Sequence, residues 1–453
     1  MKNIILLCFG FMVATPAVAL DLGIATFNVD ATPPVGSALC GGSVPPVIGV
    51  NDSLSARGLI LLPRTQEPVV ILVVDWAGIG NAGQTRWKQA LAVAVGTSVD
   101  RVVVHAIHQH DAPFCDFSVE AIMAEAGLPG EMFEPAFAME VIQRTAFAAR
   151  NALGRGVPIS HIGIGKAKVE KIASNRRILG DDGKVAQVRW TACTDPLLRA
   201  EPEGTIDPWL RTVSFWNGDV PVAILSHYAT HPQSYYRTGL VSADFPGMAR
   251  TGREKELPDS VHMHFNGAGG NIGAGKYNDG SIKNRAVLAG RLQDGMKKAF
   301  EATRKISLKN ESLGWDTEKV SLPLRTEIDL ETEKKRLADT SATLAERMNS
   351  AREIAWIERV RSDHPITISR LRVGPLQMMY MPGELFVEYQ LAAQNMAPDD
   401  FVCMAAYGDY GPGYIGTHVS YAEGGYETGL HTSRTAPEVE GVLLNAMKVL
   451  LSR

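Results

Sequence analysis

The sequence predicts an α/β fold, with mixed β-sheets flanked by helices in a single large catalytic domain. Runs of β-branched residues, typical of buried strands, alternate along the chain with segments whose apolar residues recur at helical spacing. The composition is that of a globular protein, with 45% hydrophobic and 21% charged residues among 453. No internal repeat and no low-complexity linker divides the sequence, which favours one compact domain.

The predicted elements follow one another through the chain. Strands are expected where short apolar runs end at polar or turn residues, and helices where apolar residues recur every three or four positions. The predicted strands are 69–76, a run that starts at 101 and ends in histidines, 221–228, 261–265, 375–381 and 401–406. The predicted helices are 84–95, 137–153, 284–304 and 439–451.

Residues 330–362 form a separate kind of segment. They are rich in Glu, Lys, Arg and Ala, and they contain no glycine or proline. This composition predicts a helical insertion of one or two solvent-facing helices that form a hairpin or cap. We favour a solvated helix pair over a lid or a partner surface, because runs of charge usually face water.

The N-terminus carries the features of a signal peptide. Lys2 is followed by the apolar run Ile4 to Val13 and by Ala17-Val18-Ala19, a small-x-small cleavage site. We expect cleavage after Ala19, which makes 1–19 the signal peptide, 20–453 the mature domain and the protein secreted or periplasmic. A retained membrane anchor is the alternative, although the run is short for a spanning helix.

Composition also indicates which binding partners are not expected and how many disulfide bridges the chain could form. The net charge of −4 and the lack of a basic stripe argue against a nucleic-acid partner, and no later segment is apolar enough for a stable membrane span. Four scattered cysteines remain after signal cleavage, too few for a disulfide scaffold in a chain of this size. One or two bridges are allowed, but the sequence leaves the pairing of Cys40, Cys115, Cys193 and Cys403 open.

Three histidines close the strand that starts at Arg101. Because side chains alternate along a strand, His108 and His110 are expected to point the same way. Two imidazoles on one face can converge on a metal, and imidazole suits zinc. The alternative is that both are satisfied polar residues at a strand end.

Four clusters of chemically competent residues lie far apart in sequence, each just after a predicted strand. In open α/β sheets, sites collect at such positions. Histidine, carboxylate and phenol groups are all able to bind zinc, and a zinc site with an open position activates water. The clusters are His108 with His110, the segment 225–234 around His231, the glycine-rich segment 265–275, and 381–384 followed by the aromatic-rich 410–418.

These segments, in this order, resemble the neutral/alkaline non-lysosomal ceramidase family, whose N-terminal catalytic domain shows motifs of the types A-x-x-D-I-T-P-P-x-G, H-T-H-S-G-P, N-R-S, A-V-H-P-T-S, P-G-E-F and Y-I-T-T-x-E-E-Y…R-Y-E. One such motif is weakly specific, whereas six in one order are fairly specific. The similar segments here are 25–36, His108–Pro113, Asn175–Arg177, Ala229–Ser234, Pro382–Leu385, and Tyr414–Thr417 with Tyr421 and Tyr426-Glu427.

The resemblance implies a zinc ion bound by His108, His231, Glu384 and Tyr414. It also implies that His110, Arg176 and Tyr426 bind the substrate or stabilise a developing oxyanion. The residues by themselves allow other roles. Arg176 could instead form a surface ion pair and Glu384 could cap a helix, although the site role is favoured for both, and Tyr426 is equally suited to the core or the rim of a site.

The glycine-rich segment departs from the family pattern G-D-V-S-P-N. Gly273 stands where the family has the serine thought to act as nucleophile, and Asn271 replaces the aspartate. A loop of this kind can still approach a ligand closely and offer backbone N–H groups, so Asn271 and Gly273 are predicted to contact the substrate. The family's usual C-terminal immunoglobulin-like domain and an apolar membrane-contact segment are not expected here, which weakens the case for ceramide itself.

The sequence therefore predicts a secreted zinc-dependent hydrolase of the neutral ceramidase type. We expect it to cleave an amide or ester bond of ceramide, or of another N- or O-acylated lipid or sugar, by metal-activated water, with His110 as proton shuttle. One alternative is a metal-dependent lyase or deacylase acting on a glycan, the lyase on one that contains uronate. The other is a catalytically silent zinc-bearing binding protein, which the missing serine would favour.

Overall fold

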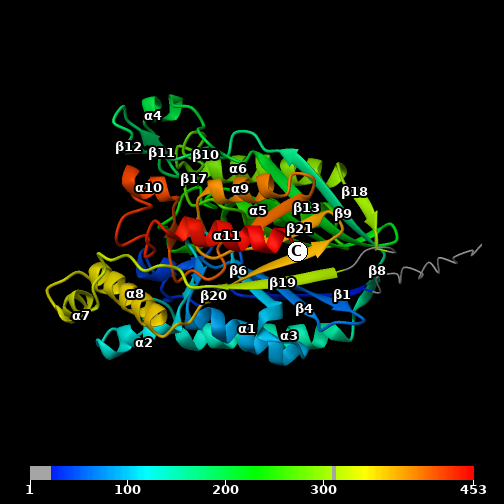
Figure 1. Ribbon diagram of the computed structural model, residues 1–453, viewed down its shortest axis with the longest axis horizontal. Helices are drawn as coiled ribbons and strands as arrows, with labels where there is room; N and C mark the ends of the chain where they lie inside the picture. The colour runs from blue at the N-terminus through cyan, green and yellow to red at the C-terminus, as the bar shows by residue number, and fades with distance from the viewer. Residues whose placement is uncertain (1–21, 309–312) are drawn as a thin grey trace, which may run out of the picture.

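The computed structural model describes residues 22–308 and 313–453 as a layered α/β structure (Figure 1). Two five-stranded sheets and one four-stranded sheet form its interior. The strand order of the first sheet is β6 (Val102–Ala106), β4 (Val69–Val74), β3 (Ser55–Pro63), β1 (Leu22–Asp30) and β8 (Val157–Ile159). The second is β16 (Val261–Asn266), β14 (Val220–Tyr228), β13 (Trp209–Asn217), β9 (His161–Lys168) and β18 (Arg304–Ser307). The third is β19 (Leu313–Val320), β20 (Ile366–Val373), β21 (Leu376–Tyr380) and β23 (Phe401–Ala405).

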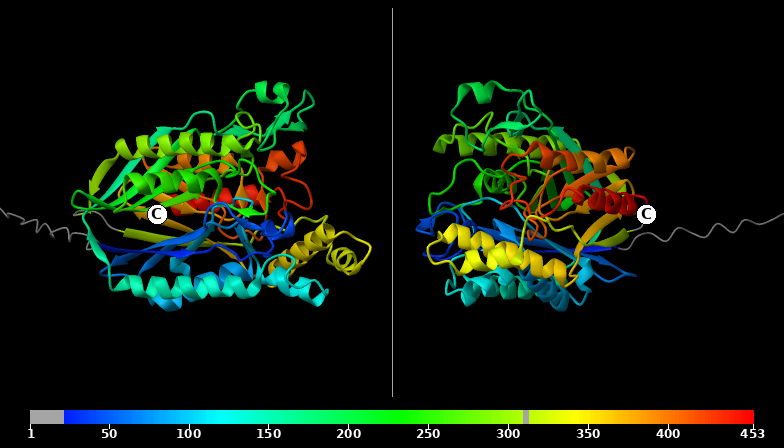
Figure 2. Two further views of the ribbon diagram at one scale, coloured as in Figure 1. Left: turned by 180° about the vertical axis from the view of Figure 1, so that it is seen from behind. Right: turned by 60° about the vertical axis from the view of Figure 1, so that its left-hand side comes forward.

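The three sheets share one apolar core, and helices cover their outer faces. Buried side chains from all three sheets, such as Ile71, Leu225 and Leu371, belong to this one cluster. Burying such faces on both sides explains why the strands are continuous apolar runs. The first sheet is covered by α1 (Ala82–Val95) and α3 (Pro135–Leu153), the second by α5 (Asp244–Glu256) and α6 (Ile282–Glu301), and the third by α9 (Val387–Met396) and α11 (Val439–Leu451), as Figure 2 shows from two further sides.

The carboxyl ends of three strands, one from each sheet, meet at one place. Each sheet contains one parallel pair, β4 with β6, β14 with β16, and β21 with β23. Just beyond β6, β16 and β23 the chain is cross-linked by backbone hydrogen bonds, from Ala106 N to Tyr407 O over 3.0 Å and from Ala406 N to Asn266 O over 2.9 Å. The loops that leave these strands are therefore gathered at one edge, where α/β proteins place their sites.

Short two-stranded ladders fix these loops. They pair segments that follow different strands, which holds the loop backbones in register with one another. The ladders nearest the site are β5 (Gly78–Ile79) with β7 (Phe114–Cys115), β10 (Ser174–Asn175) with β17 (Ile272–Gly273), and β22 (Glu384–Leu385) with β24 (Tyr414–Ile415). Farther out lie β2 (Gly49–Val50), β11 (Arg177–Leu179), β12 (Val185–Val188), β15 (Leu240–Val241), α2 (Phe117–Glu125), α4 (Pro196–Ala200) and α10 (His418–Glu423).

The predicted fold class is confirmed, and each predicted strand and helix exists in the structure. Most boundaries shift by one or two residues, and two differences matter more. Strand β6 ends at Ala106, so the alternation argument for His108 and His110 is wrong: the chain has left the strand, and His108 has a left-handed φ of 75°. The helix predicted for 284–304 ends at Glu301, and β18 begins at Arg304.

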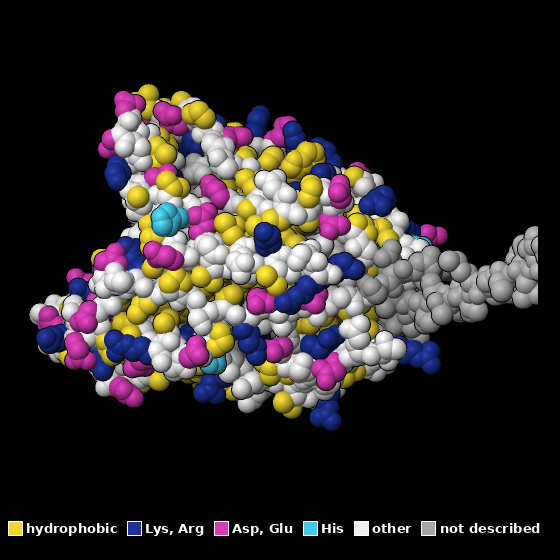
Figure 3. Space-filling model, in the orientation of Figure 1, with side chains coloured by type: hydrophobic (Ala, Val, Ile, Leu, Met, Phe, Trp, Pro, Cys, Tyr) yellow, Lys and Arg dark blue, Asp and Glu magenta, His cyan; other side chains and the backbone are white. Residues whose placement is uncertain are grey.

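The charged insertion is a helical hairpin of α7 (Leu330–Ala338) and α8 (Leu344–Arg361). Its outer surface carries charges of both signs (Figure 3). The expectation of a solvated pair is nevertheless wrong for α8, because Met348, Ala351 and Ile354 are buried in the same cluster as the first sheet's helices. Small residues such as Ser350 and Ala351 let the helix pack closely, so a weakly apolar sequence still buries one face.

The structure also bears on the predictions about the signal peptide, membrane spans and disulfide bridges. The predicted signal peptide lies outside the described residues. Within the part of the chain that the structure covers, no helix is long and apolar enough to cross a membrane. The cysteines Cys40, Cys115, Cys193 and Cys403 are all free, so the optional bridges are not formed.

Candidate active site

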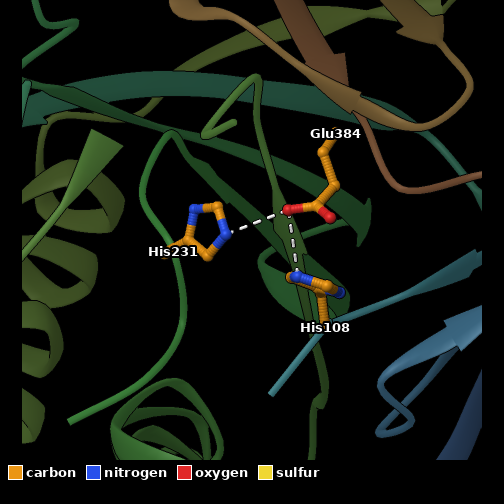
Figure 4. A group of neighbouring side chains, drawn as sticks. All are labelled: His108, His231 and Glu384. Carbon is orange, nitrogen blue, oxygen red and sulfur yellow. Dashed lines mark ion pairs between the residues drawn. The ribbon is translucent and has the colours of Figure 1, made fainter. Parts of the chain in front are cut away.

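Three side chains from separate clusters converge where the strand ends meet. His108, His231 and Glu384 are at most 4% exposed, and their ligand atoms all lie within 4.8 Å of one another (Figure 4). Glu384 Oε2 lies 3.1 Å from His108 Nε2 and 2.9 Å from His231 Nε2. Residues that are more than 100 positions apart in the sequence thus form one compact group.

Backbone carbonyls orient the two imidazoles. His108 Nδ1 is 2.6 Å from the carbonyl oxygen of Ala77, and His231 Nδ1 is 2.7 Å from that of Gly269. Because a carbonyl can only accept a hydrogen bond, each Nδ1 carries the proton. The neutral form of each ring therefore turns an unprotonated Nε2 toward Glu384, which is the arrangement of metal-binding histidines.

Two glycines bring Glu384 next to Tyr414. The two residues are paired directly in the parallel ladder of β22 and β24, and Glu384 N donates to Gly413 O over 2.9 Å. Gly383 and Gly413 have φ values of 58° and 69°, and a Cβ on either would lie within 2.6 Å of a backbone oxygen. Glycine is the residue that fits such left-handed, crowded positions, so the Pro-Gly-Glu and Gly-Pro-Gly-Tyr segments build this corner.

The donor set fits a divalent metal. Burial favours the neutral acid of Glu384, whereas protonated imidazoles at His108 and His231 hold the pKa of Glu384 well below its usual range. When both rings are instead in the neutral form with the proton on Nδ1, two nitrogen lone pairs and Glu384 Oε2 face one another with no hydrogen between them, and Oε2 has no hydrogen-bond donor. A cation among these three atoms would relieve that repulsion, and two imidazoles with one carboxylate are typical zinc ligands.

Tyr414 extends the group toward Arg176. The Tyr414 hydroxyl is 3.0 Å from His231 Nε2 and accepts a hydrogen bond from Arg176 Nη2 over 2.8 Å. Arg176 Nε donates to Glu427 over 2.7 Å, and both members of this ion pair are at most 3% exposed. Burial opposes the charge, but Tyr414 and Glu427 raise the pKa of Arg176 above its usual value. Arg176 is thus a buried, fixed cation behind the phenol and not part of a surface ion pair.

A cavity of about 350 Å³ opens onto the group, with His108, Glu384 and Tyr414 among its lining residues. His110 and Tyr426 also line the cavity, where the ring of His110 lies 5.2 Å from that of His108. Burial, followed by the neighbouring imidazoles, lowers the pKa of His110 well below 6.5, so it is a neutral base at neutral pH. The rest of the wall is formed by Cys40, Ser43, Ala77, Phe114, Ala345, Met348, Asn349, Arg352, Tyr410, Gly413, His431, Thr432 and Arg434.

The structure does not bring Asn271 and Gly273 to this cavity. Asn271 Oδ1 accepts a hydrogen bond from Val387 N over 2.9 Å, and its Nδ2 donates to Glu388 over 2.9 Å. Its amide therefore holds the first turn of α9. Gly273 lies in β17, paired with Ser174 and close to Arg176.

Several residues of the site were not singled out from the sequence. Tyr410 donates a hydrogen bond to Glu384 Oε1 and stacks on His108, with ring centroids 5.4 Å apart. It belongs to the aromatic-rich segment 410–418, which was a usable signal. Glu427 likewise follows Tyr426 in a quoted motif. For Arg352 and Arg434 the sequence holds no such signal, because arginine in a charged helix or a loop is usually solvated.

Comparison with known proteins adds a fold relationship. No protein-family model matches the chain, and no curated protein does. Two solved structures are similar in fold: a ceramidase complexed with C2, at a TM-score of 0.70 and 16% identity, and the neutral ceramidase from Pseudomonas aeruginosa, at 0.70 and 17%. The alignments cover 95% and 96% of this chain and 75% of each of the other two. The chain therefore has the neutral ceramidase fold, which agrees with the motif resemblance.

Proposed function

We propose that this chain is a zinc-dependent hydrolase that cleaves an amide or ester bond of an acylated substrate. One observation carries the proposal: Glu384 Oε2 and the Nε2 atoms of His108 and His231 face one another, buried, at a cavity in a ceramidase fold. His108, His231, Glu384 and Tyr414 would hold the ion. When bound, zinc supplies Lewis-acid polarisation of a carbonyl and lowers the pKa of water to about 7.

The protein's own groups would position that chemistry. Tyr410 holds one carboxylate oxygen of Glu384, which leaves the other for the ion. Arg176 donates to the Tyr414 hydroxyl, and this fixes the phenol oxygen beside His231. Such preorganised donors stabilise the negative charge that develops on the carbonyl oxygen during acyl transfer. Tyr426, which lines the cavity with its ring 5.8 Å from that of Tyr414, would contact the substrate from the cavity wall.

His110 is the proposed proton carrier. As a neutral imidazole on the cavity wall, it can take a proton from the attacking water. It would then deliver that proton to the nitrogen or oxygen atom that leaves with the second product. The acyl group departs as a carboxylate, so the reaction consumes one water for each bond cleaved.

The serine hydroxyls considered as nucleophiles are already hydrogen-bonded, and that of Ser43, which lines the cavity, donates to Cys40 O over 2.7 Å. Gly273 has no side chain, and the hydroxyls of Ser234 and Ser242 donate to buried or partly buried carboxylates, over 2.7 Å to Asp244 and 2.6 Å to Asp52. Neither serine lines the cavity. Attack by water on the substrate carbonyl is therefore the mechanism we propose. We also propose that the protein acts outside the cytoplasm, on the basis of segment 1–19.

The proposal is tested by metal analysis of the purified protein together with a substrate screen. The screen contains ceramide, N-acyl amino acids, O-acetylated sugars and polyuronates. We expect bound zinc, and hydrolysis that stops on chelation and returns when zinc is added back. An unsaturated uronate product would instead identify a lyase. Substrate binding without turnover of any member would identify a binding protein, and either outcome would contradict the proposal.

A further inference from the structure

The wall of the active-site cavity carries two arginines without a carboxylate partner. Arg352, from α8, donates to Gly41 O over 2.9 Å and to Asn349 Oδ1 over 3.1 Å. Arg434 makes one long contact, from Nη1 to Gly411 O over 3.4 Å, and its Nε has no partner. Within residues 22–308 and 313–453, neither guanidinium lies within ion-pair distance of an acidic side chain.

This is unusual within the molecule, because Arg434 is only 5% exposed. Each of the other buried arginines of the described chain has either a carboxylate partner or several backbone carbonyl acceptors. Arg189 donates to four backbone carbonyls, those of Asn175, Leu198, Glu201 and Pro202. The remaining pairs are Arg57–Glu254, Arg176–Glu427, Arg211–Asp207, Arg250–Asp75, Arg253–Glu256, Arg285–Asp244 and Arg370–Asp316.

The positive charges of Arg434 and Arg352 also repel one another. Burial, and then the positive charge of Arg352, lower the pKa of Arg434. The carboxylate of Glu353, whose charge favours that of Arg434, is paired with His431 over 2.8 Å and so is already engaged. A buried cation beside a second cation costs free energy unless an anion compensates it. A protein retains such an arrangement where a ligand supplies the missing charge.

The residues that line the cavity indicate which kind of ligand could contact both arginines. Arg352, Arg434, His108 and Glu384 all line it, so an occupant of the metal group also faces the guanidinium groups. Arg352 is held in place, with its Cζ 5.9 Å from the ring centroid of Phe114 and its Nη2 on Gly41 O. The guanidinium fork matches the geometry of a carboxylate, to which it donates two parallel hydrogen bonds.

We propose that Arg352 and Arg434 form a subsite for a carboxylate carried by the substrate, close to the acyl bond that is cleaved. This inference rests on the proposed function and makes it narrower: the substrate is an acylated acid rather than a neutral lipid. The charged helical hairpin then has a role, because α8 supplies Arg352 and Asn349 to the cavity. The carboxylate can belong to an amino acid or to a uronic acid.

The test compares substrates that differ only in that charge. The amino-acid arm uses N-octanoylglycine against N-octanoylglycinamide, and the sugar arm uses O-acetylated galacturonate against O-acetylated galactose. We expect wild-type kcat/KM to favour the charged member of at least one pair, and the favoured pair identifies the source of the carboxylate. In Arg352→Gln that ratio should fall by about tenfold or more, as for loss of a hydrogen bond between charged groups. Arg361→Gln, an exposed position on the same helix, should leave the ratio unchanged.

Arg434→Met separates a ligand-binding role from a structural one. If the charge serves the ligand, its removal should lower the same ratio while the melting temperature stays equal or rises, because an uncompensated buried charge is lost. A preference of wild type for the neutral members, or equal effects of Arg352→Gln on both members of a pair with zinc retained, would overturn the subsite.

If no member is hydrolysed, the proposed function fails for these substrates, and calorimetric titration with N-octanoylglycine and with galacturonate still decides the subsite. Binding of either acid that is lost in Arg352→Gln supports it. Equal binding of acid and neutral partner, or no binding of either acid, rules it out.

Discussion

Arg176 Nη2 donates a hydrogen bond of 2.8 Å to the hydroxyl oxygen of Tyr414. This bond uses one lone pair of the phenol and turns the oxygen toward His231 Nε2, 3.0 Å away. Glu427 fixes the other side of the guanidinium, and Arg177 Nη1 donates to the second oxygen of Glu427 over 3.0 Å. The phenol is therefore held by a buried chain of charges whose links lie outside the cavity.

Tyr414→Phe should leave the fold intact and lower kcat/KM by about 100-fold, the usual effect of removing one preorganised polar group from an active site. The ring still packs on His231, with centroids 5.9 Å apart, so stability should change little. The measurement is steady-state kinetics together with the zinc content and the melting temperature. Tyr421→Phe is the control, because that hydroxyl bonds to Ser433 and Thr435 away from the cavity. Equal activity of Tyr414→Phe and wild type would remove the phenol from the mechanism.

His108→Ala or His231→Ala should abolish both zinc binding and hydrolysis. Each imidazole is one of the four proposed ligands, and the two histidines with Glu384 form the compact group, so the ligands that remain hold the ion weakly. Inductively coupled plasma mass spectrometry of the purified variants measures the metal directly. Cys193→Ser, a buried thiol outside the cavity, should keep both properties. A His231→Ala variant with wild-type turnover would show that the metal group is not the site of the reaction.

Asp116 makes stability depend on pH. Burial is the main cause that raises its pKa from 3.8 to about 6, although it caps α2 through Ser118 N and Val119 N. Because the folded pKa is the higher one, the folded state binds the proton more tightly. The stability from this group is fully present below pH 3.8 and is lost as the pH rises through about 6. A shift of roughly two units corresponds to about 3 kcal/mol.

Asp116→Asn should therefore remove this pH dependence while it keeps the helix cap, since asparagine is also a good N-cap. Urea unfolding at several pH values between 4 and 7 measures the difference in unfolding free energy between wild type and variant. The wild type should lose up to about 3 kcal/mol relative to the variant across that range. Asp195→Asn, at the exposed N-cap of α4, should show no comparable change. A difference that is flat with pH would contradict the raised pKa.

The strands predicted from the sequence are short apolar runs, whereas the buried strands β3 and β13 were not predicted. The apolar runs that became β4, β14 and β16 were recognisable because both of their faces are buried. Strand β9 was missed because it contains Gly163 and Gly165, and glycine is depleted in strands. Here a Cβ at Gly165 would lie 2.2 Å from Ala299 O, so the glycine lets α6 pack against the sheet. Such a tertiary cause leaves no local signal.

At the site, too, residues with a local sequence signal were predicted, and residues whose role depends on distant contacts were not. His108, His231 and Glu384 were predictable because ligand-type residues follow predicted strands, and the structure does bring them together. Asn271 was expected to face the substrate, but its amide holds the start of α9, a partnership between residues over 100 positions apart. Arg352 and Arg434 become noticeable only when the carboxylates around them can be counted, which needs the three-dimensional arrangement.

Gly273 provides the last test, since it occupies the position that resembles the family's serine. A Cβ there would lie 3.5 Å from Thr191 Oγ1 and 4.0 Å from Arg176 Cδ, which are ordinary contacts. Gly273→Ser should therefore fold normally and keep its zinc. Gly275→Ser is the contrasting variant, because its Cβ would lie 1.9 Å from Trp190 O and should destabilise the protein.

Inhibition and mass-spectrometry experiments then distinguish water from serine as the nucleophile. With no side chain at Gly273, wild-type activity should resist serine-directed covalent reagents and fall with chelators, and intact-protein mass spectrometry during turnover should show no acyl adduct. Gly273→Ser should have activity of the same order as wild type, because the wild-type reaction does not need a hydroxyl there. An adduct trapped on Ser234, Ser242 or another serine of the wild type would mean that a relocated hydroxyl attacks the substrate, and the water mechanism would be wrong.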